Sequence, residues 1–220
     1  MNEKKRNLKS ALDRLCRYVD DAIEDGYKLI IISDRFIDSS HAPIPSLLSS
    51  ACVHNHLIRS GNRGKVGLII ESGDSWEVHH YATLLSFGVN AVNPYVAFAT
   101  IRQLRESNSS SSLNKLKTLN KNYIDAIDKG LLKVFSKIGI STLQSYSGSQ
   151  LFEIIGLNRR TVDEYFTSTT SRIEGIGVDE LERENNKKHF HAYSDEISDI
   201  SDGGVYLSLI HISEPTRRKR

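Results

Sequence analysis

The chain has 220 residues, a formal net charge of +2, 39% hydrophobic residues and 25% charged residues. This composition is typical of a globular chain with one sizeable core or part of a larger one, and the near-balanced charge gives no electrostatic case for nucleic acid or an anionic membrane as a partner. Its apolar runs stay short of the roughly 20 residues that span a bilayer, and the start MNEKKRNLKS lacks the apolar stretch of a secretory signal, so we expect a cytoplasmic protein.

The first hundred residues alternate between helical and strand patterns. Apolar residues recur at helical spacing over residues 8–25 and the pattern ends at Gly26. The predicted strands are 29–32, 66–70 and 89–93, of which the first two are typical of strands buried on both faces. The predicted helices that follow them cover 47–58, 76–87 and 94–104. Strands that alternate with helices through short turns predict an α/β fold, with a parallel sheet flanked by helices in a doubly wound or barrel-like arrangement.

A polar stretch interrupts this alternation. Residues 105–121 are rich in Ser, Asn and Lys, with four consecutive serines at 109–112, and predict a solvated loop. Apolar residues at helical spacing over 122–136, with charged residues on the other face, then predict an amphipathic helix that Gly139 ends.

The remaining elements are short. We expect a strand at 140–143 and a second helix at 150–155, because the first segment is rich in β-formers and the second resumes a helical pattern. Asn158 is placed to cap a further helix. A polar loop over 168–177 and a last helix over 178–189 are expected beyond it.

A candidate site is expected at the carboxyl edge of the sheet, because the loops there meet helix N-termini that present unpaired N–H groups. The polar residues placed at this edge are Asp34, Arg35, Glu71, Ser72, Asn93, Thr142 and Gln144. A plainer interpretation is that these groups cap helices and pair with one another, with Asp34 and Arg35 forming an ion pair that holds a loop. We assign no catalytic residue among them.

Neither the cysteines nor the histidines have the spacing of a metal site. Cys16 and Cys52 lie on predicted helices without a C-x-x-C pair, so we expect reduced thiols in the core. His79 and His80 are adjacent on a predicted helix, where their side chains point about 100° apart and do not suit one metal ion. The sequence GNRGKVG at 61–67 precedes a strand, whereas a phosphate loop follows one, so a phosphate site is rejected there.

Three ordered blocks carry a resemblance to a known family. They are SDRFIDSSHAPIPSLLSSACVHNHLIRSGNRGKVGLIIESGDSWEVHHYATLLSFGVNAVNPYVAF at 33–98, KGLLKVFSKIGISTLQSYSGSQLFEIIGLN at 129–158 and YFTSTTSRIEGIGVDEL at 165–181. Together they closely resemble the central domain of glutamate synthase large subunits, and the resemblance covers most of the chain up to about residue 191.

The resemblance implies a part of an oxidoreductase that makes L-glutamate from L-glutamine and 2-oxoglutarate. In this family a glutaminase domain releases ammonia, which passes inside the protein to a flavin barrel where FMN supplies the hydride. A 3Fe-4S cluster delivers electrons from an electron donor subunit that uses NAD(P)H, or from ferredoxin. The central domain bridges the glutaminase and flavin domains and helps enclose the ammonia route. A plastid location is implied if the source is a photosynthetic eukaryote.

Other family features are missing from this chain. It begins Met1-Asn2 instead of the family's N-terminal nucleophilic cysteine, and Cys16 and Cys52 are too few to ligate an iron–sulfur cluster. We therefore expect a fragment that binds no cofactor, is inactive alone, and exposes apolar patches that its neighbours would cover. The alternative is a self-contained α/β binding or scaffold module without catalysis.

The chain is expected to divide into three segments. Residues 1–193 would be part of the central domain, and 194–206 a linker toward the flavin domain. Residues 207–220 match nothing in the family and resemble translated sequencing-adapter peptides, so we expect a non-native tail, a genuine basic tail being the alternative.

Overall fold

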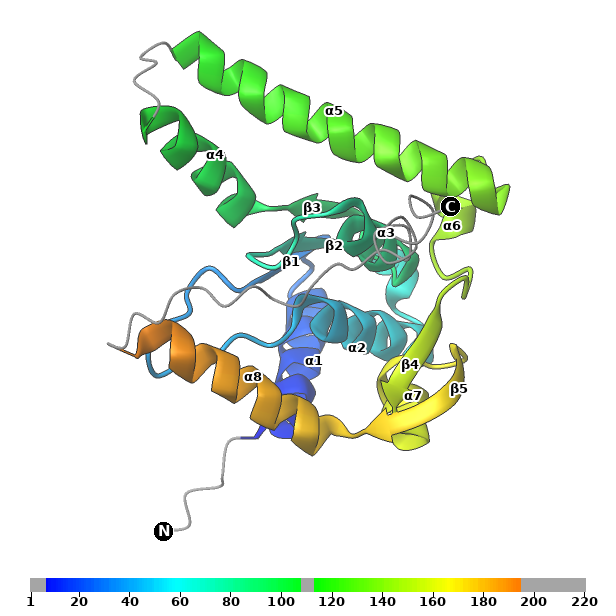
Figure 1. The fold of residues 1–220 in the computed structure, drawn as a ribbon. Coiled ribbons are helices and arrows are strands. Elements are labelled where there is room, and N and C mark those ends of the chain that lie inside the picture. The colour runs from blue at the N-terminus through cyan, green and yellow to red at the C-terminus, as the bar shows by residue number, and fades with distance from the viewer. Residues whose placement is uncertain (1–6, 108–112, 195–220) are drawn as a thin grey trace, which may run out of the picture.

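The computed structural model describes residues 7–107 and 113–194, which form two small parallel sheets with helices packed around them (Figure 1). The strands are β1 (Leu29–Ser33), β2 (Gly67–Glu71), β3 (Ala91–Asn93), β4 (Glu153–Leu157) and β5 (Thr170–Ile176). The helices are α1 (Leu8–Glu24), α2 (Ser46–Arg59), the 3-10 turn η1 (Arg63–Lys65), α3 (Val78–Ser86), α4 (Tyr95–Ser107), α5 (Leu113–Ile138), α6 (Leu143–Tyr146), α7 (Arg159–Tyr165) and α8 (Val178–Tyr193). The predicted α/β class with parallel strands is confirmed, and the described strands form no closed barrel.

The main sheet contains the three strands predicted in the first hundred residues. Its order is β1-β2-β3, all parallel, and Ile31, Ile69 and Ala91 stand side by side in register across it. The crossover from β1 to β2 contains α2, and the crossover from β2 to β3 contains α3. All three strands therefore end at one edge of the sheet, where the candidate site was expected.

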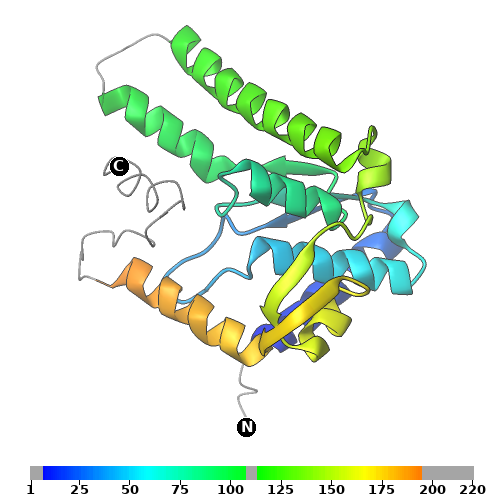
Figure 2. The ribbon, with the colours of Figure 1, turned by 45° about the vertical axis from the view of Figure 1, so that its right-hand side comes forward.

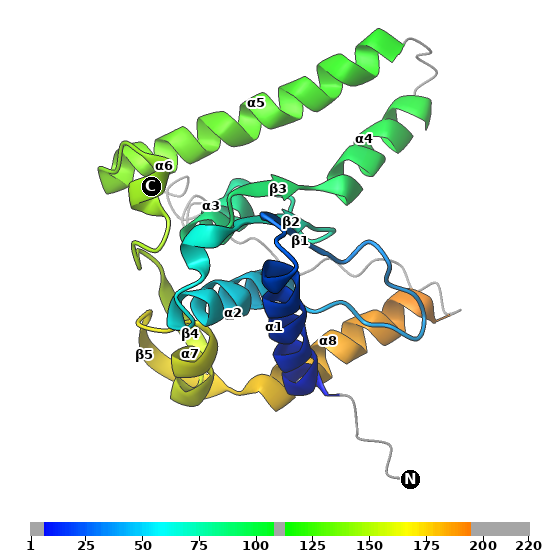
Figure 3. The ribbon, with the colours of Figure 1, turned by 180° about the vertical axis from the view of Figure 1, so that it is seen from behind.

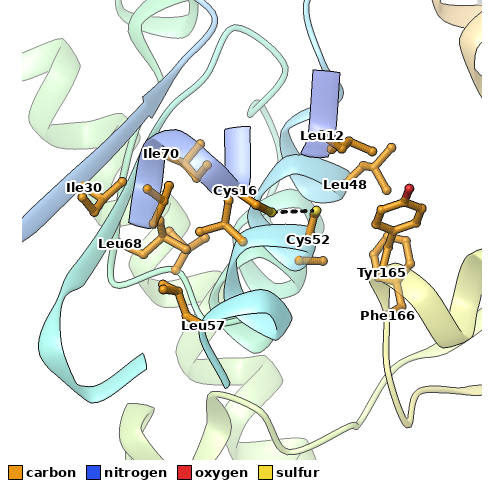
Figure 4. Packing of buried hydrophobic residues seen from close by; sticks show 14 of the residues in the cluster. Leu12, Cys16, Ile30, Leu48, Cys52, Leu57, Leu68, Ile70, Tyr165 and Phe166 are labelled. Atoms are coloured by element: carbon orange, nitrogen blue, oxygen red, sulfur yellow. Dashed lines mark hydrogen bonds between the residues drawn. The ribbon is translucent and has the colours of Figure 1, made fainter. Parts of the chain in front are cut away.

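One face of this sheet packs against helices and forms the core. Ile30, Leu68 and Ile70 point into a cluster of buried side chains from α1, α2 and α7, shown in Figure 4. The members labelled there from these helices are Leu12, Cys16, Leu48, Cys52, Leu57 and Tyr165, together with Phe166 directly after α7. Figure 3 shows α1 beside α2 beneath the sheet. Removal of this apolar surface from water is the main force that holds α1 and α2 against the strands.

The other face of β1 is open. Leu29 and Ile31 are 64% and 62% exposed, although Ile30 between them is only 9% exposed. The prediction that this strand is buried on both faces is therefore wrong for the described residues. The physical reason is that α1 and α2 pack on the face of β1 that carries Ile30, while the face that carries Leu29 and Ile31 stays exposed.

The polar stretch at 105–121 is largely helical, which corrects the predicted loop. Its first residues complete α4, residues 113–121 belong to the 26-residue α5, and 108–112 lie outside the described residues. Leu116 and Leu119 continue the helical spacing of the amphipathic stripe toward the N-terminus, so the pattern extends farther back than residue 122. Figure 2 shows α4 and α5 lying together on one side of the molecule.

Within residues 7–107 and 113–194, no helix has both the length and the apolar character needed to cross a membrane.

The elements after α5 differ most from prediction. The strand expected at 140–143 does not form, and this segment leads into the single helical turn α6. The helix expected at 150–155 does not form either, because strand β4 begins at Glu153. The polar loop expected at 168–177 contains β5, which pairs in parallel with β4. The two strands approach closely at a glycine pair, because a Cβ on Gly175 would come within 2.4 Å of the Gly156 carbonyl oxygen. Asn158 caps α7 as predicted, with its side chain accepting a hydrogen bond from the Thr161 N–H.

Candidate functional site

Five of the seven predicted site residues meet at the carboxyl edge of the main sheet, and Glu71 at the end of β2 is their centre. Its carboxylate accepts hydrogen bonds from Arg35 Nη2 at 2.6 Å, Ser33 Oγ at 2.6 Å and Asn93 Nδ2 at 3.0 Å. The bond from Arg35, followed by that from Ser33, lowers the pKa of Glu71 to about 2. Glu71 is therefore ionised near neutral pH and fully engaged by its neighbours, which suits a structural anchor better than a proton-transfer group.

Asp34 holds the loop that follows β2. Both of its carboxylate oxygens accept from the backbone N–H of Gly73, at 3.1 and 2.9 Å. It also accepts a hydrogen bond from Tyr95, and burial together with this contact raises the pKa of Tyr95 to about 12. Arg35 lies 4.3 Å from the centre of the Tyr95 ring and forms its ion pair with Glu71. The expected ion pair between Arg35 and Asp34 is therefore wrong.

Ser72 is buried just beyond β2 and joins the strand edge to the start of α2. Its Oγ lies 2.7 Å from Ser46 Oγ and accepts from the backbone N–H of Asp74 at 3.0 Å. These contacts fix the turn after β2 against the first residue of α2. Polar groups at this edge thus pair with one another and with loop backbone, as the plainer interpretation of the sequence proposed.

Thr142 and Gln144 do not belong to this cluster. Thr142 caps α6, where its Oγ1 accepts from the Ser145 N–H at 3.3 Å. The same short helix is held against α3 by Tyr146, whose hydroxyl donates to the Ala82 carbonyl at 2.9 Å. Thr142 and Gln144 were expected at the sheet edge because a strand was predicted at 140–143, and that strand does not form.

A hollow of about 430 Å³ lies beside the cluster. Its lining comes from the end of β1, the loop that follows it, the start of α2, the end of β2 and one residue of α1, Leu15. The apolar part of the lining includes Ile31, Phe36 and Ile37, and the polar part includes Asp34 and Ser46. The hollow is therefore continuous with the open face of β1, and apolar side chains form much of its wall.

Sequence reasoning missed three partners in this cluster, namely Ser33, Ser46 and Tyr95. Ser33 directly precedes Asp34 at the end of a predicted strand, so its position was visible in the pattern. Ser46 and Tyr95 open the helices after β1 and β3. Residues at helix starts on the same edge could have been included by the rule that located the others.

The two cysteines are unpaired and buried, as predicted, with their Sγ atoms 3.5 Å apart. Within the part of the chain that the structure describes, no group of three or more His, Cys, Asp or Glu side chains is arranged to hold a metal ion. Two thiols packed against each other in a core do not fit a 3Fe-4S cluster, which needs thiolates from several clustered cysteines.

Comparison with known proteins gives the fold a family. The sequence model of the glutamate synthase central domain family matches residues 1–158 of this chain. The chain belongs to the glutamate synthase central domain family. The matched part of this central-domain chain contains the main sheet, the α4 and α5 pair and the strand-edge cluster.

Relatives of the central-domain chain are long proteins with different stated electron donors. It is 39% identical to the glutamate synthase (NADPH) large chain of Bacillus subtilis over 199 residues, which are 90% of this chain and 13% of the relative. It is 38% identical to the glutamate synthase (NADH) of Saccharomyces cerevisiae, over 93% of this chain and 10% of the relative. It is 39% identical to ferredoxin-dependent glutamate synthase 1 of Arabidopsis thaliana, over 86% of this chain and 12% of the relative.

Proposed function

We propose that this chain serves as the central-domain part of a glutamate synthase, an oxidoreductase that makes L-glutamate from L-glutamine and 2-oxoglutarate with a reduced flavin. The observation that carries the proposal is family membership, based on the match over residues 1–158 and on relatives at 38–39% identity over 86% or more of the chain. The chain spans 10–13% of those relatives, so the activity belongs to the longer protein.

The proposed role of this part is structural. The polar edge of the sheet supports that role. Glu71 accepts hydrogen bonds from three donors and Asp34 accepts one from a backbone N–H, so both carboxylates hold the loops at this edge in place. FMN and the 3Fe-4S cluster would be held by other domains of the full-length protein. The partners we infer are the glutaminase and flavin domains of the same chain, with ferredoxin or a donor subunit supplying electrons.

An apolar surface supports the proposed bridging between domains. We define the open β1 surface as Leu29, Ile31, Phe36 and Ile37, which are 64%, 62%, 89% and 38% exposed. Three of these side chains line one hollow, and Leu29 lies two residues before Ile31 on the same strand face. Contiguous exposed apolar patches mark contact sites in folded proteins, so this surface is where we place a neighbouring domain of the same polypeptide.

The complete reading frame tests the proposed activity. We expect it to contain a glutaminase region and a flavin region with clustered cysteines, and the full-length protein to form glutamate from glutamine and 2-oxoglutarate when reduced donor is supplied. The 220-residue chain alone should form none. A reading frame without those two regions, or turnover by the 220-residue chain alone, would contradict the proposal.

Substitutions on β1 test the bridging role. In the full-length protein, Leu29→Ser with Ile31→Ser should loosen the contact between domains and raise the amount of glutamine consumed per glutamate formed. Ile155→Ser is the matched control, since Ile155 is a 69% exposed strand residue in the other sheet. In the isolated chain, the double variant should keep the far-ultraviolet circular dichroism of the parent and self-associate less. An unchanged consumption ratio together with unchanged self-association would remove the open β1 surface from the proposal.

The cellular location follows from the same proposal. We place the protein in the cytoplasm, or in the plastid if its source is a photosynthetic eukaryote. Immunodetection in fractionated cells checks this, and recovery with a membrane fraction would contradict it.

A further inference from the structure

The two cysteines of the chain face each other across the contact between α1 and α2 (Figure 4). Their Sγ atoms are 3.5 Å apart, and Cys16 and Cys52 are 8% and 4% exposed. Such sulfur atoms are already in contact, and a bond between them needs only a local approach of two side chains on helices that are packed together. This thiol pair has no part in the strand-edge cluster or in the proposed bridging role.

The surroundings of the pair favour one thiolate. One helical turn farther along each helix, His56 of α2 and Asp20 of α1 form their own contact, with Nε2 and Oδ2 2.7 Å apart. The hydrogen bond from Cys52 is the largest cause that lowers the pKa of Cys16 to about 7. The charge of His56 adds to it, while burial and the charges of Asp20 and Asp13 oppose it. The pKa of Cys52 is raised by the same contact and by burial. Cys16 is thus the nucleophile of the pair and Cys52 the protonated neighbour.

We propose that Cys16 and Cys52 form a dithiol site that low-molecular-weight disulfides oxidise to an intramolecular disulfide joining α1 to α2. In the first step, the Cys16 thiolate attacks one sulfur of a disulfide R–S–S–R, forms a mixed disulfide and releases one thiolate RS⁻. In the second step, Cys52 loses its proton to solvent and attacks the Cys16 sulfur, which releases the second RS⁻. The protein loses two electrons and two protons, and the small disulfide is reduced to two thiols.

The disulfide would stabilise the fold. It closes a loop between residues 36 positions apart, which restricts the unfolded chain. For a chain of this size, the expected rise in Tm is on the order of 10 °C. The buried position predicts slow formation, because the small disulfide reaches Cys16 only when the edge of the α1 and α2 contact opens.

The experiment uses the 220-residue chain under native conditions with oxidised glutathione as the probe. We expect intact mass to fall by about 2 Da, both thiols to become unreactive toward iodoacetamide, and a disulfide-linked peptide pair with Cys16 and Cys52 to appear after digestion. Reduction with dithiothreitol should restore both thiols. Cys16→Ala and Cys52→Ala are the matched controls, and neither can lose this mass.

Kinetics test the assignment of roles. The rate of thiol loss in the parent chain should rise with pH around 7. Cys52→Ser, which keeps a hydroxyl donor to Cys16, should accumulate the mixed disulfide at Cys16 faster than Cys16→Ser does at Cys52. The proposal is overturned if the folded parent keeps both thiols, if it stops at a mixed disulfide, or if the disulfide forms only in denaturant or between two chains. These readouts need no enzymatic activity, so they stand or fall separately from the proposed function.

Discussion

A buried histidine, His54, accepts a hydrogen bond from Arg63 at the amino end of the main sheet and makes the free energy of unfolding depend on pH. Arg63 of η1 donates through Nε to His54 Nδ1 at 3.0 Å, and through its other nitrogens to the carbonyls of Val66 at 2.8 Å and Gly88 at 2.5 Å. His54 is 8% exposed and accepts a hydrogen bond from a cation, so it must be neutral in the folded chain.

The magnitude follows from the pKa. Burial, with a smaller contribution from the charge of Arg63, lowers the pKa of His54 from 6.5 to about 4. Between these values the unfolded chain binds a proton at this position and the folded chain does not. The stabilising contribution of neutral His54 is therefore complete above pH 6.5 and is lost as pH falls toward 4. At about 1.4 kcal/mol per unit, His54 alone should lower the free energy of unfolding by about 3 kcal/mol at pH 4 relative to pH 7.5.

Urea unfolding followed by circular dichroism at several pH values between 7.5 and 4 measures this loss. The comparison protein is His54→Gln, whose amide oxygen can still accept from Arg63 but whose side chain does not titrate. Other titrating groups affect both proteins equally, so the difference between the two curves isolates His54. The parent should lose about 3 kcal/mol more than the variant over this range. Parallel loss of stability in both proteins would refute the assignment of a buried neutral histidine.

Three further predictions concern close contacts and a helix cap. Gly88 and Gly26 both have φ +88°, but their surroundings differ. A Cβ on Gly88 would come within 1.9 Å of His54 Nδ1, whereas a Cβ on Gly26 would have nothing within 4 Å. In urea titrations, Gly88→Ala should therefore lower the free energy of unfolding by at least about 2 kcal/mol more than Gly26→Ala does. Gly130→Ala lies within α5 and would bring a Cβ within 2.3 Å of Val78 Cγ2, so it should destabilise the chain by about 1 kcal/mol or more despite the higher helix propensity of alanine. Adding Val78→Ala should offset part of that loss, and a more stable Gly130→Ala chain would contradict the contact between α3 and α5. Asn158→Ala should cost about 1 kcal/mol by removing the cap of α7, while Asn158→Asp keeps the acceptor and should stay close to the parent.

The sequence predicted the first hundred residues well because their patterns are long and locally consistent. The first two strand segments of the main sheet are largely apolar runs, the third is a short segment between Gly88 and Pro94, and the helices between them have regular apolar spacing. The segment 150–155 has neither advantage. It is a short apolar run that fits a helix or a strand equally well, and its pairing as β4 depends on β5, which lies beyond α7 and whose side chains are mostly exposed.

The candidate site was predictable to the extent that the strands were. Asp34, Glu71 and Asn93 follow or end the three strands of the main sheet, so the rule for parallel sheets brought them together correctly. Thr142 and Gln144 were included through a strand that does not form. The pairing of Arg35 with Glu71 instead of its neighbour Asp34 depends on the register of β1 and β2, where Ser33 lies opposite Glu71. The sequence contains no local signal of that register.

The open face of β1 links the failed prediction to the proposed function. Four consecutive apolar residues at 29–32 indicate a strand buried on both faces, yet Leu29 and Ile31 remain more than 60% exposed in this chain. Full burial of such a side chain contributes about 1.5–3 kcal/mol, so two of them left in water forgo a contribution comparable with that of His54. Under the proposed bridging role, a neighbouring domain would cover this face, which would account for an apolar pattern that the described residues leave exposed. Substitution of Leu29 and Ile31 with serine should therefore leave the isolated chain folded, whereas Ile30→Ser, which places a hydroxyl in the core of the same strand, should unfold it or lower its stability by several kcal/mol.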